Sequence, residues 1–191
     1  MKTLQVQNIS LAFGDRDLLK NVSFTLSDRG RAALAGANGS GKSTLLKIIT
    51  SIASCDSGEV TKTKGMRVSY LPQSDIVHSG TTLREEVEKA FYRFVGIMQE
   101  ISDLEKKLED VREDNSSVEQ LLHLLHEKHE ILIHSNYYRR EAVIERIAKG
   151  LGFKQSDLDN KCETFSGGWQ MRIALAKVLA EDPDVLLLDE P

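Results

Sequence analysis

The chain has little of several features that would assign a protein class on their own. Its 191 residues include two cysteines, Cys55 and Cys162, with no Cys-x-x-Cys pair and no histidine nearby at metal-ligand spacing. Such cysteine usage is typical of a reducing cytosol and gives no disulfide framework. No apolar run approaches the roughly 20 residues that a membrane-spanning helix needs, and residues 1–7 lack the apolar core of a signal peptide. We therefore expect a cytoplasmic chain with no direct membrane insertion.

Basic charge is not in excess either. The 25 Lys and Arg residues face 29 Asp and Glu residues, which gives a formal net charge of −4. No global basic surface is available for nucleic acid, so any such contact has to be local. A composition that is 40% hydrophobic and 28% charged is ordinary for a globular protein. The length fits one domain, or one domain with an appendage.

What the chain does contain is a glycine-rich loop before a helical pattern. Residues 36–43 read Gly-Ala-Asn-Gly-Ser-Gly-Lys-Ser and fit G-x-x-x-x-G-K-[ST], and we expect residues 31–35 before them to form a short buried strand. Glycines let the backbone close around a phosphate chain, and the following helix N-terminus presents N–H groups to the anion. Lys42 adds charge at the β/γ-phosphates, and the Ser43 hydroxyl is a hard ligand for Mg²⁺. The pattern predicts a triphosphate site at Gly36, Asn38, Gly39, Ser40, Gly41, Lys42, Ser43 and Thr44.

A second pattern stands at the end of the sequence. Residues 185–190, Val-Leu-Leu-Leu-Asp-Glu, predict an apolar strand that ends in two carboxylates. Such runs are typical of buried parallel strands, and ligands of open α/β sheets bind at the carboxyl ends of the strands. We expect Asp189 to hold magnesium and Glu190 to act as the general base that orients the attacking water. A charged turn after a strand explains the same residues, but the glycine-rich loop favours the catalytic interpretation.

A further glycine pair precedes another helical pattern. Ser166-Gly167-Gly168 lies 23 residues before Asp189. Ser166 can cap the helix, and the two glycines let the backbone approach a ligand. The tripeptide alone is only a turn, and its spacing from the carboxylates is what indicates a second anion-binding helix N-terminus.

The middle of the chain is helical, whereas the first eighty residues are rich in strands. From Thr81, apolar residues recur at steps of three or four up to Val111, which predicts one helix of about thirty residues with a capping box at Thr82 and Glu85. A second helix should fold back on it to form a hairpin. Residues 103–114 carry a net charge of −3, a poor match for phosphate contact at the hairpin tip. Two interpretations fit the four histidines of this segment: a solvated helix face or a metal site. They are His123, His126, His129 and His134.

The order of these motifs resembles that of an ATP-binding cassette ATPase, with Gln73 of Tyr70-Leu71-Pro72-Gln73 as the fourth motif. Within that family the chain most resembles the first nucleotide-binding domain of the ABC-F subfamily, whose members carry two ATPase domains per chain. Trp169 follows the glycine pair, where transporter cassettes usually have Gln. Gln73 and Ser166 are also 93 residues apart, farther than in most transporter cassettes.

The resemblance implies an α/β fold: a P-loop NTPase of the ATP-binding cassette type, with an antiparallel β subdomain and an inserted helical subdomain that carries a helical hairpin arm. Residues 1–80 would form the ATP-binding core, residues 81–180 the helical subdomain with the signature motif, and residues 181–191 the strand that returns to the core. ATP and Mg²⁺ are the implied cofactors. Phe13 resembles the aromatic residue that stacks on adenine, although core packing explains it equally.

The resemblance also implies partners. Gln73 would couple Mg²⁺ and water to movement of the helical subdomain. Ser166, Gly167 and Gly168 would contact the γ-phosphate of ATP held by a second cassette, in the same chain or in a homodimer. ABC-F proteins resemble factors of the translating ribosome, which makes ribosome and RNA implied partners.

Two other classes remain open: the ATPase subunit of an ABC membrane transporter, and a truncated nucleotide-binding module without turnover. The family pattern continues after Glu190 with a D-loop and a switch histidine, which this sequence does not contain. On that pattern we expect an open sheet edge, weakened nucleotide binding and low hydrolysis for this chain alone.

Overall fold

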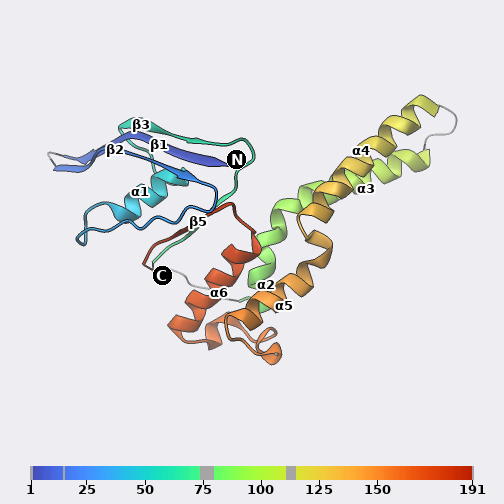
Figure 1. The fold of residues 1–191 in the computed structure, drawn as a ribbon. Helices are drawn as coiled ribbons and strands as arrows, with labels where there is room; N and C mark the ends of the chain where they lie inside the picture. Colours follow the sequence, from blue (N-terminus) through green and yellow to red (C-terminus); the bar gives the residue numbers. More distant parts are fainter. Residues whose placement is uncertain (1, 15, 74–79, 111–114, 191) are drawn as a thin grey trace. The chain divides into compact units, whose positions relative to one another are not determined.

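The computed structural model describes residues 2–14, 16–73, 80–110 and 115–190, which fall into two compact units (Figure 1). The first unit comprises Met1–Ile76 and Asp182–Pro191, and the second comprises Val77–Glu181. Each unit has its own cluster of buried apolar side chains. The two units are therefore described separately.

A three-stranded antiparallel sheet forms one layer of the first unit, in the order β2-β1-β3. Its strands are β1 (Thr3–Phe13), β2 (Arg16–Ser27) and β3 (Ser57–Lys62). Leu4 and Val6 alternate with more exposed neighbours in β1, as a strand with one buried face requires. The expected β-rich start of the chain is confirmed.

Helix α1 (Lys42–Ile49) and a parallel strand pair complete the first unit. The pair consists of β4 (Val68–Leu71) and β5 (Val185–Leu188), which are distant in sequence. Leu45, Leu46, Ile48 and Ile49 of α1 pack in one cluster with β1 residues and with Leu187 of β5. Because β4 and β5 are parallel, the residues that follow them meet at one edge of the pair.

The expected buried strand before the glycine-rich loop is wrong. Residues 31–35 have no regular secondary structure and are exposed, with Leu34 at 43%. Within the described residues β5 pairs only with β4, and two cavities of about 520 and 350 Å³ are lined both by residues 30–34 and by β5. A strand forms only where its backbone N–H and C=O groups find a neighbouring strand, and residues 31–35 have none here. For the same reason β5 is only partly buried, with Leu188 39% exposed.

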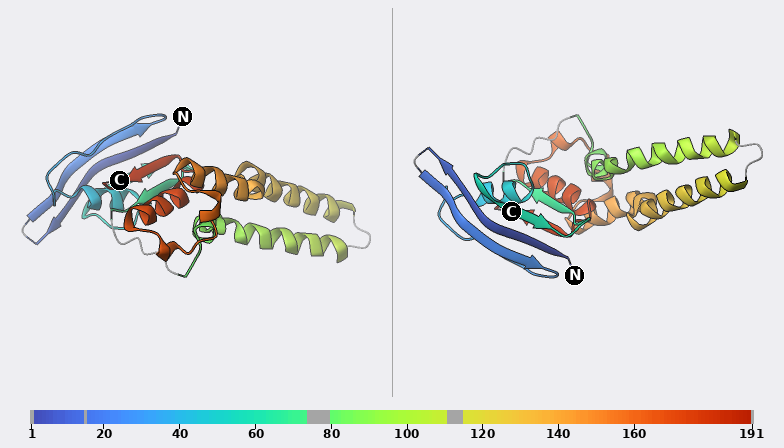
Figure 2. Two further views of the ribbon diagram at one scale, coloured as in Figure 1. Left: turned by 90° about the horizontal axis from the view of Figure 1, so that it is seen from below. Right: turned by 90° about the horizontal axis from the view of Figure 1, so that it is seen from above.

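The second unit is helical and contains an antiparallel hairpin. Helices α3 and α4 lie side by side in all three views (Figures 1 and 2), and α2, α5 and α6 pack together at the base of the hairpin. The elements are α2 (Leu83–Glu88), α3 (Val95–Asp110), α4 (Asn115–His134), α5 (Arg140–Gly150) and α6 (Gly167–Ala180), with short 3₁₀ segments η1 (Lys89–Phe94), η2 (Tyr137–Arg139), η3 (Gln155–Asp157) and η4 (Cys162–Thr164).

The expected helix of about thirty residues is interrupted. The 3₁₀ segment η1 separates α2 from α3, and it buries Phe91 and Phe94 edge-on against Tyr137 at ring distances of 6.5 and 5.7 Å. This tertiary packing overrides the helical periodicity of the sequence. The capping box at Thr82 and Glu85 is confirmed by both of its hydrogen bonds.

One alternative from the sequence, the histidine metal site, finds no support in the described part of the chain. No group of three or more His, Cys, Asp or Glu side chains there is arranged to hold a metal ion, and His129 instead lies 2.6 Å from the Tyr138 hydroxyl. None of the helices formed by the described residues is long and apolar enough to cross a membrane.

Candidate functional site

The glycine-rich loop is shaped by glycines that no other residue could replace without strain. Gly39 and Gly41 have φ angles of +74° and +91°. A Cβ atom on Gly41 would lie 2.9 Å from Leu19 Cδ2 and 3.0 Å from Leu18 Cγ, so the loop packs directly on β2. Gly41 is also the N-cap of α1 and provides no side-chain cap, which leaves the first N–H groups of the helix available to an anion.

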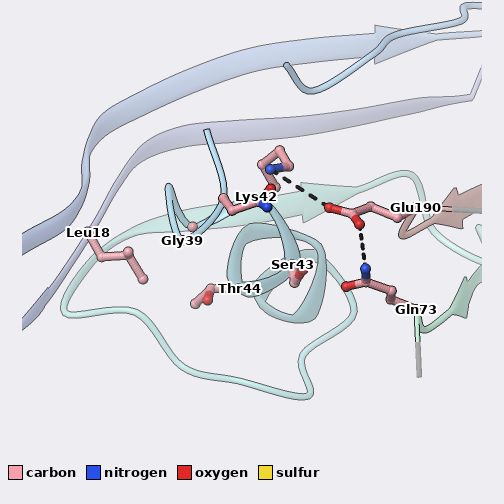
Figure 3. Close-up of a pocket in the computed structure, with 9 residues that line it drawn as sticks. Leu18, Gly39, Lys42, Ser43, Thr44, Gln73 and Glu190 are labelled. Atoms are coloured by element: carbon pink, nitrogen blue, oxygen red, sulfur yellow. Dashed lines mark hydrogen bonds and ion pairs between the residues drawn. The ribbon is translucent and has the colours of Figure 1, made fainter. Parts of the chain in front are cut away.

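Lys42 lies across the opening of this loop. Its Nζ donates hydrogen bonds to the carbonyl oxygens of Gly36 and Ala37 at 3.1 and 3.2 Å. It also lies 4.0 Å from Glu190 Oε1 (Figure 3). The ammonium group is thus placed between the loop and a carboxylate from the other end of the chain.

The ends of β4 and β5 bring two predicted residues together. Gln73 Nε2 donates a hydrogen bond to Glu190 Oε2, and both side chains line the same cavity (Figure 3). Glu190 has a φ of +50°, the left-handed region that side-chain-bearing residues rarely adopt. Such strained backbone positions cluster at functional sites, which agrees with a chemical task for this residue.

Asp189 is held by two hydroxyl groups. It is 5% exposed; Ser43 Oγ donates to its Oδ1 at 2.9 Å and the Tyr70 hydroxyl donates to its Oδ2 at 2.9 Å. Burial, followed by the hydrogen bond to Asp189 and the charge of that residue, raises the pKa of Tyr70 to about 12. The Tyr70 hydroxyl therefore stays a proton donor at neutral pH.

A cavity of about 300 Å³ lies between the glycine-rich loop and the side chains of Gln73 and Glu190; it is lined by Leu18, Asn38, Gly39, Gly41, Lys42, Ser43, Thr44, Gln73 and Glu190. The chemical groups around this cavity fit a magnesium–nucleotide complex. Loop N–H groups and Lys42 suit an anion, while Ser43, Gln73 and Asp189 offer the hard oxygen atoms that Mg²⁺ prefers. No cation of the described chain forms an ion pair with the buried Asp189, and a buried carboxylate is costly without one.

The structure brings some of the predicted site residues together and leaves others apart. The loop, Gln73, Asp189 and Glu190 all lie in the first unit. Several loop residues, Gln73 and Glu190 line the cavity, whereas Asp189 reaches it through its hydrogen bond with Ser43. Phe13 is 65% exposed at the end of β1, so the core interpretation is wrong. The sequence did not predict that Leu18 lines the cavity, because an aliphatic residue in a strand is typical of core packing. It also missed Tyr70, whose partner Asp189 lies 119 positions further along the chain.

The glycine pair of the second unit opens α6. Ser166 is the N-cap, and its carbonyl oxygen accepts hydrogen bonds from the Trp169 and Gln170 N–H groups at 2.9 Å. The expected side-chain cap is absent, because the Ser166 hydroxyl makes no capping hydrogen bond. A Cβ atom on Gly167 or Gly168 would meet nothing within 4 Å. The helix N-terminus is therefore accessible.

Trp169 fixes the first turn of α6 from the side. Its ring lies 4.8 Å from that of Phe153, and the Arg172 guanidinium stacks on it at 4.4 Å from the centroid. Arg172 also donates a hydrogen bond to the Leu151 carbonyl oxygen at 3.2 Å. The first turn of α6 is thus anchored to the end of α5, while Gly167 and Gly168 remain accessible.

The fold and the site define an ATP-binding cassette domain of the P-loop NTPase type. A sequence profile described as ABC transporter matches residues 19–191, so the chain belongs to that family. Two solved structures share the fold: the ATP-binding subunit of an ABC transporter (TM-score 0.68, 17% identity, 97% of this chain and 65% of that one) and the dimeric bacterial ABC transporter cassette MJ0796 (TM-score 0.64, 21% identity, 97% and 73%).

Curated relatives of the chain include a protein of the ABC-F branch. The ABC transporter ATP-binding protein YfmM of Bacillus subtilis is 36% identical over 191 residues, which is all of this chain and 36% of YfmM. ABC transporter F family member 5 of Arabidopsis thaliana is 36% identical over 98% of this chain and 27% of its own length. The translational throttle protein EttA of Escherichia coli K12 is 31% identical over 92% and 31%. The chain is thus similar to ABC-F proteins and spans about a third of the length of these relatives.

Proposed function

We propose that this chain binds ATP with Mg²⁺ in the cavity at the glycine-rich loop and hydrolyses it as half of a two-cassette ATPase. One observation carries the proposal: the Ser43 hydroxyl lies 2.9 Å from Asp189, although 146 positions separate the two residues. The fold thereby brings the phosphate-binding loop to the strand-end carboxylates. Nucleotide hydrolysis requires both parts in one site.

Each residue takes a role that its contacts support. The loop N–H groups and Lys42 bind the triphosphate, and Ser43, Gln73 and Asp189 hold Mg²⁺, which neutralises phosphate charge when it is bound. Glu190 accepts a proton from the attacking water and orients it toward the γ-phosphate. The amide of Gln73 holds the Glu190 carboxylate in position. The exposed ring of Phe13 is free to stack on adenine.

The second cassette supplies the remaining contact. The accessible helix N-terminus at Ser166, Gly167 and Gly168 suits an anion, and we assign to it the γ-phosphate of ATP bound by the other cassette. That cassette belongs to the same polypeptide or to a second copy. The relatives, about three times as long as this chain, leave room for it within one polypeptide.

A titration with a fluorescent ATP analogue tests the nucleotide site. Removal of the Lys42 ammonium with Lys42→Ala should weaken binding by about 10- to 100-fold, since a charged hydrogen bond contributes about 1.5–3 kcal/mol. Lys47→Ala is the matched control, because Lys47 is exposed on the same helix. Equal affinities of the two variants would contradict the site.

We further propose that the intact protein acts on the ribosome. The support is the name of the relative EttA, an energy-dependent translational throttle protein, together with the ABC-F branch. Intact protein with Glu190→Gln, which should retain ATP without hydrolysing it, is expected to cosediment with ribosomes in ATP but not in ADP. A transporter subunit would instead copurify with a membrane protein in detergent, and that result would replace this proposal.

A further inference from the structure

Tyr70 makes a contact that no motif of the sequence assigns. In β4 it lies opposite Leu187 of β5, two residues before Asp189. Its ring packs against the apolar cluster of the first unit, and its hydroxyl reaches the Asp189 carboxylate at 2.9 Å. The parallel register of the two strands produces this contact, because it carries the end of one side chain past the end of the neighbouring strand.

The two donors at Asp189 act on different oxygen atoms. Ser43 donates to Oδ1 and Tyr70 donates to Oδ2. The terminal torsion of an aspartate is broad, so a carboxylate with one donor can turn about its bond, whereas one held at both oxygen atoms cannot. Asp189 is also almost completely buried, which leaves little water to replace a lost donor.

We propose that Tyr70 is a positioning residue for the magnesium site: its hydroxyl fixes the Asp189 carboxylate in the orientation that directs Oδ1 toward Ser43 and the metal. This inference rests on the proposed nucleotide site. Tyr70 does not line the cavity, and its hydroxyl donates to Asp189, so we assign it no direct contact with the nucleotide or the metal.

The expected change in Mg²⁺ affinity follows from the kind of contact that Tyr70 makes, a hydrogen bond to a metal ligand. Partners that orient a metal ligand typically change metal affinity 10- to 100-fold when they are removed. Tyr70→Phe deletes one hydroxyl and keeps the ring that packs in the core. Affinity for the nucleotide without metal should stay the same, because the loop and Lys42 bind the phosphates without Asp189.

The experiment is a Mg²⁺ titration of the intact protein in the presence of a fluorescent ATP analogue, from an EDTA baseline. Tyr70→Phe should raise the Mg²⁺ midpoint 10- to 100-fold and leave binding in EDTA unchanged. Tyr92→Phe, at an exposed tyrosine of the second unit, should match the wild type. In an Asp189→Asn background, Tyr70→Phe should change the midpoint no further, because the two residues act as one unit.

The outcomes separate the two proposals. If the wild type binds no nucleotide, the proposed function fails. If it binds and Tyr70→Phe has an unchanged or lower Mg²⁺ midpoint, only the positioning role fails; a lower midpoint would mean that the hydroxyl competes with the metal for Oδ2. The thermal unfolding midpoint in EDTA checks that the variant is folded. Replacement of Tyr70 by 3-fluorotyrosine, which keeps the hydroxyl, should retain the wild-type Mg²⁺ midpoint.

Discussion

At the scale of single residues, the glycines of the phosphate-binding loop have two different tasks. Gly41 packs against Leu18 and Leu19 of β2, so its missing side chain makes room for the protein itself. A Cβ atom on Gly39 would meet nothing within 4 Å, and Gly39 lines the cavity, so we expect its missing side chain to make room for a ligand. The same sequence motif thus encodes one structural and one binding requirement.

Alanine substitutions should separate these tasks. Both positions have positive φ, which costs an alanine about 1–2 kcal/mol. Gly41→Ala adds a steric overlap with β2, and we expect it to lower the free energy of unfolding by about 1–3 kcal/mol more than Gly39→Ala does. Gly39→Ala should mainly weaken nucleotide binding. Urea unfolding and analogue titration measure the two effects, and equal destabilisation would argue against the packing role of Gly41.

At the scale of elements, the pairing of β4 with β5 assembles the site. Asp184 secures the start of this pair: it accepts hydrogen bonds from Lys2 Nζ at 2.7 Å and from the Arg67 N–H group at 2.9 Å. The hydrogen bond from Lys2, followed by that from Arg67, lowers the pKa of Asp184 below its usual value. The opposite ends of the same strands present Gln73, Asp189 and Glu190.

Removing the charge of Asp184 should lower the free energy of unfolding by an amount that depends on pH. Asp184→Asn is expected to lower the free energy of unfolding by about 1 kcal/mol at neutral pH, the upper range for a partly exposed ion pair. Because the folded-state pKa is lowered, the stabilisation is complete above about pH 4 and is lost as pH falls through that lowered pKa. Unfolding of both proteins at pH 7 and pH 3 measures this.

The exposed pair of Asp17 with Lys20, at 3.5 Å, provides a control for this prediction. Asp17→Asn should change the free energy of unfolding by only a few tenths of a kcal/mol at either pH. A difference between wild type and Asp184→Asn that is as large at pH 3 as at pH 7 would show that the charge of Asp184 is not the cause.

The site was predictable where chemistry dictates residue types in a fixed order, as in the loop and at Asp189 and Glu190. The strand expected at residues 31–35 could not be judged from its own sequence, because a strand depends on a neighbour. The interruption at η1 depends on Tyr137, a contact more than forty residues away. The contact of Tyr70 with Asp189 was hidden for the same reason, since the two residues lie 119 positions apart in the sequence.

At the scale of the whole molecule, the chemistry is divided between two units with separate cores. The first unit carries the cavity at the glycine-rich loop. The second unit presents the accessible N-terminus of α6. We account for this division by a paired arrangement, in which the signature helix of one cassette meets the nucleotide of another. The chain covers 36% of YfmM, so a relative of that length has room for a second cassette.

The central claim is that Glu190 activates water for ATP hydrolysis, and steady-state hydrolysis by the intact protein tests it most directly. Turnover should be measured for the wild type, for Glu190→Gln and for the control Glu59→Gln, an exposed carboxylate on β3. If the polypeptide carries a second cassette, that cassette is inactivated in all three proteins. Glu190→Gln should lower turnover at least about 100-fold while ATP binding stays at the wild-type level, as expected for loss of a general base. Unchanged turnover, or no turnover in the wild type, would contradict the account and favour a nucleotide-binding module without catalysis.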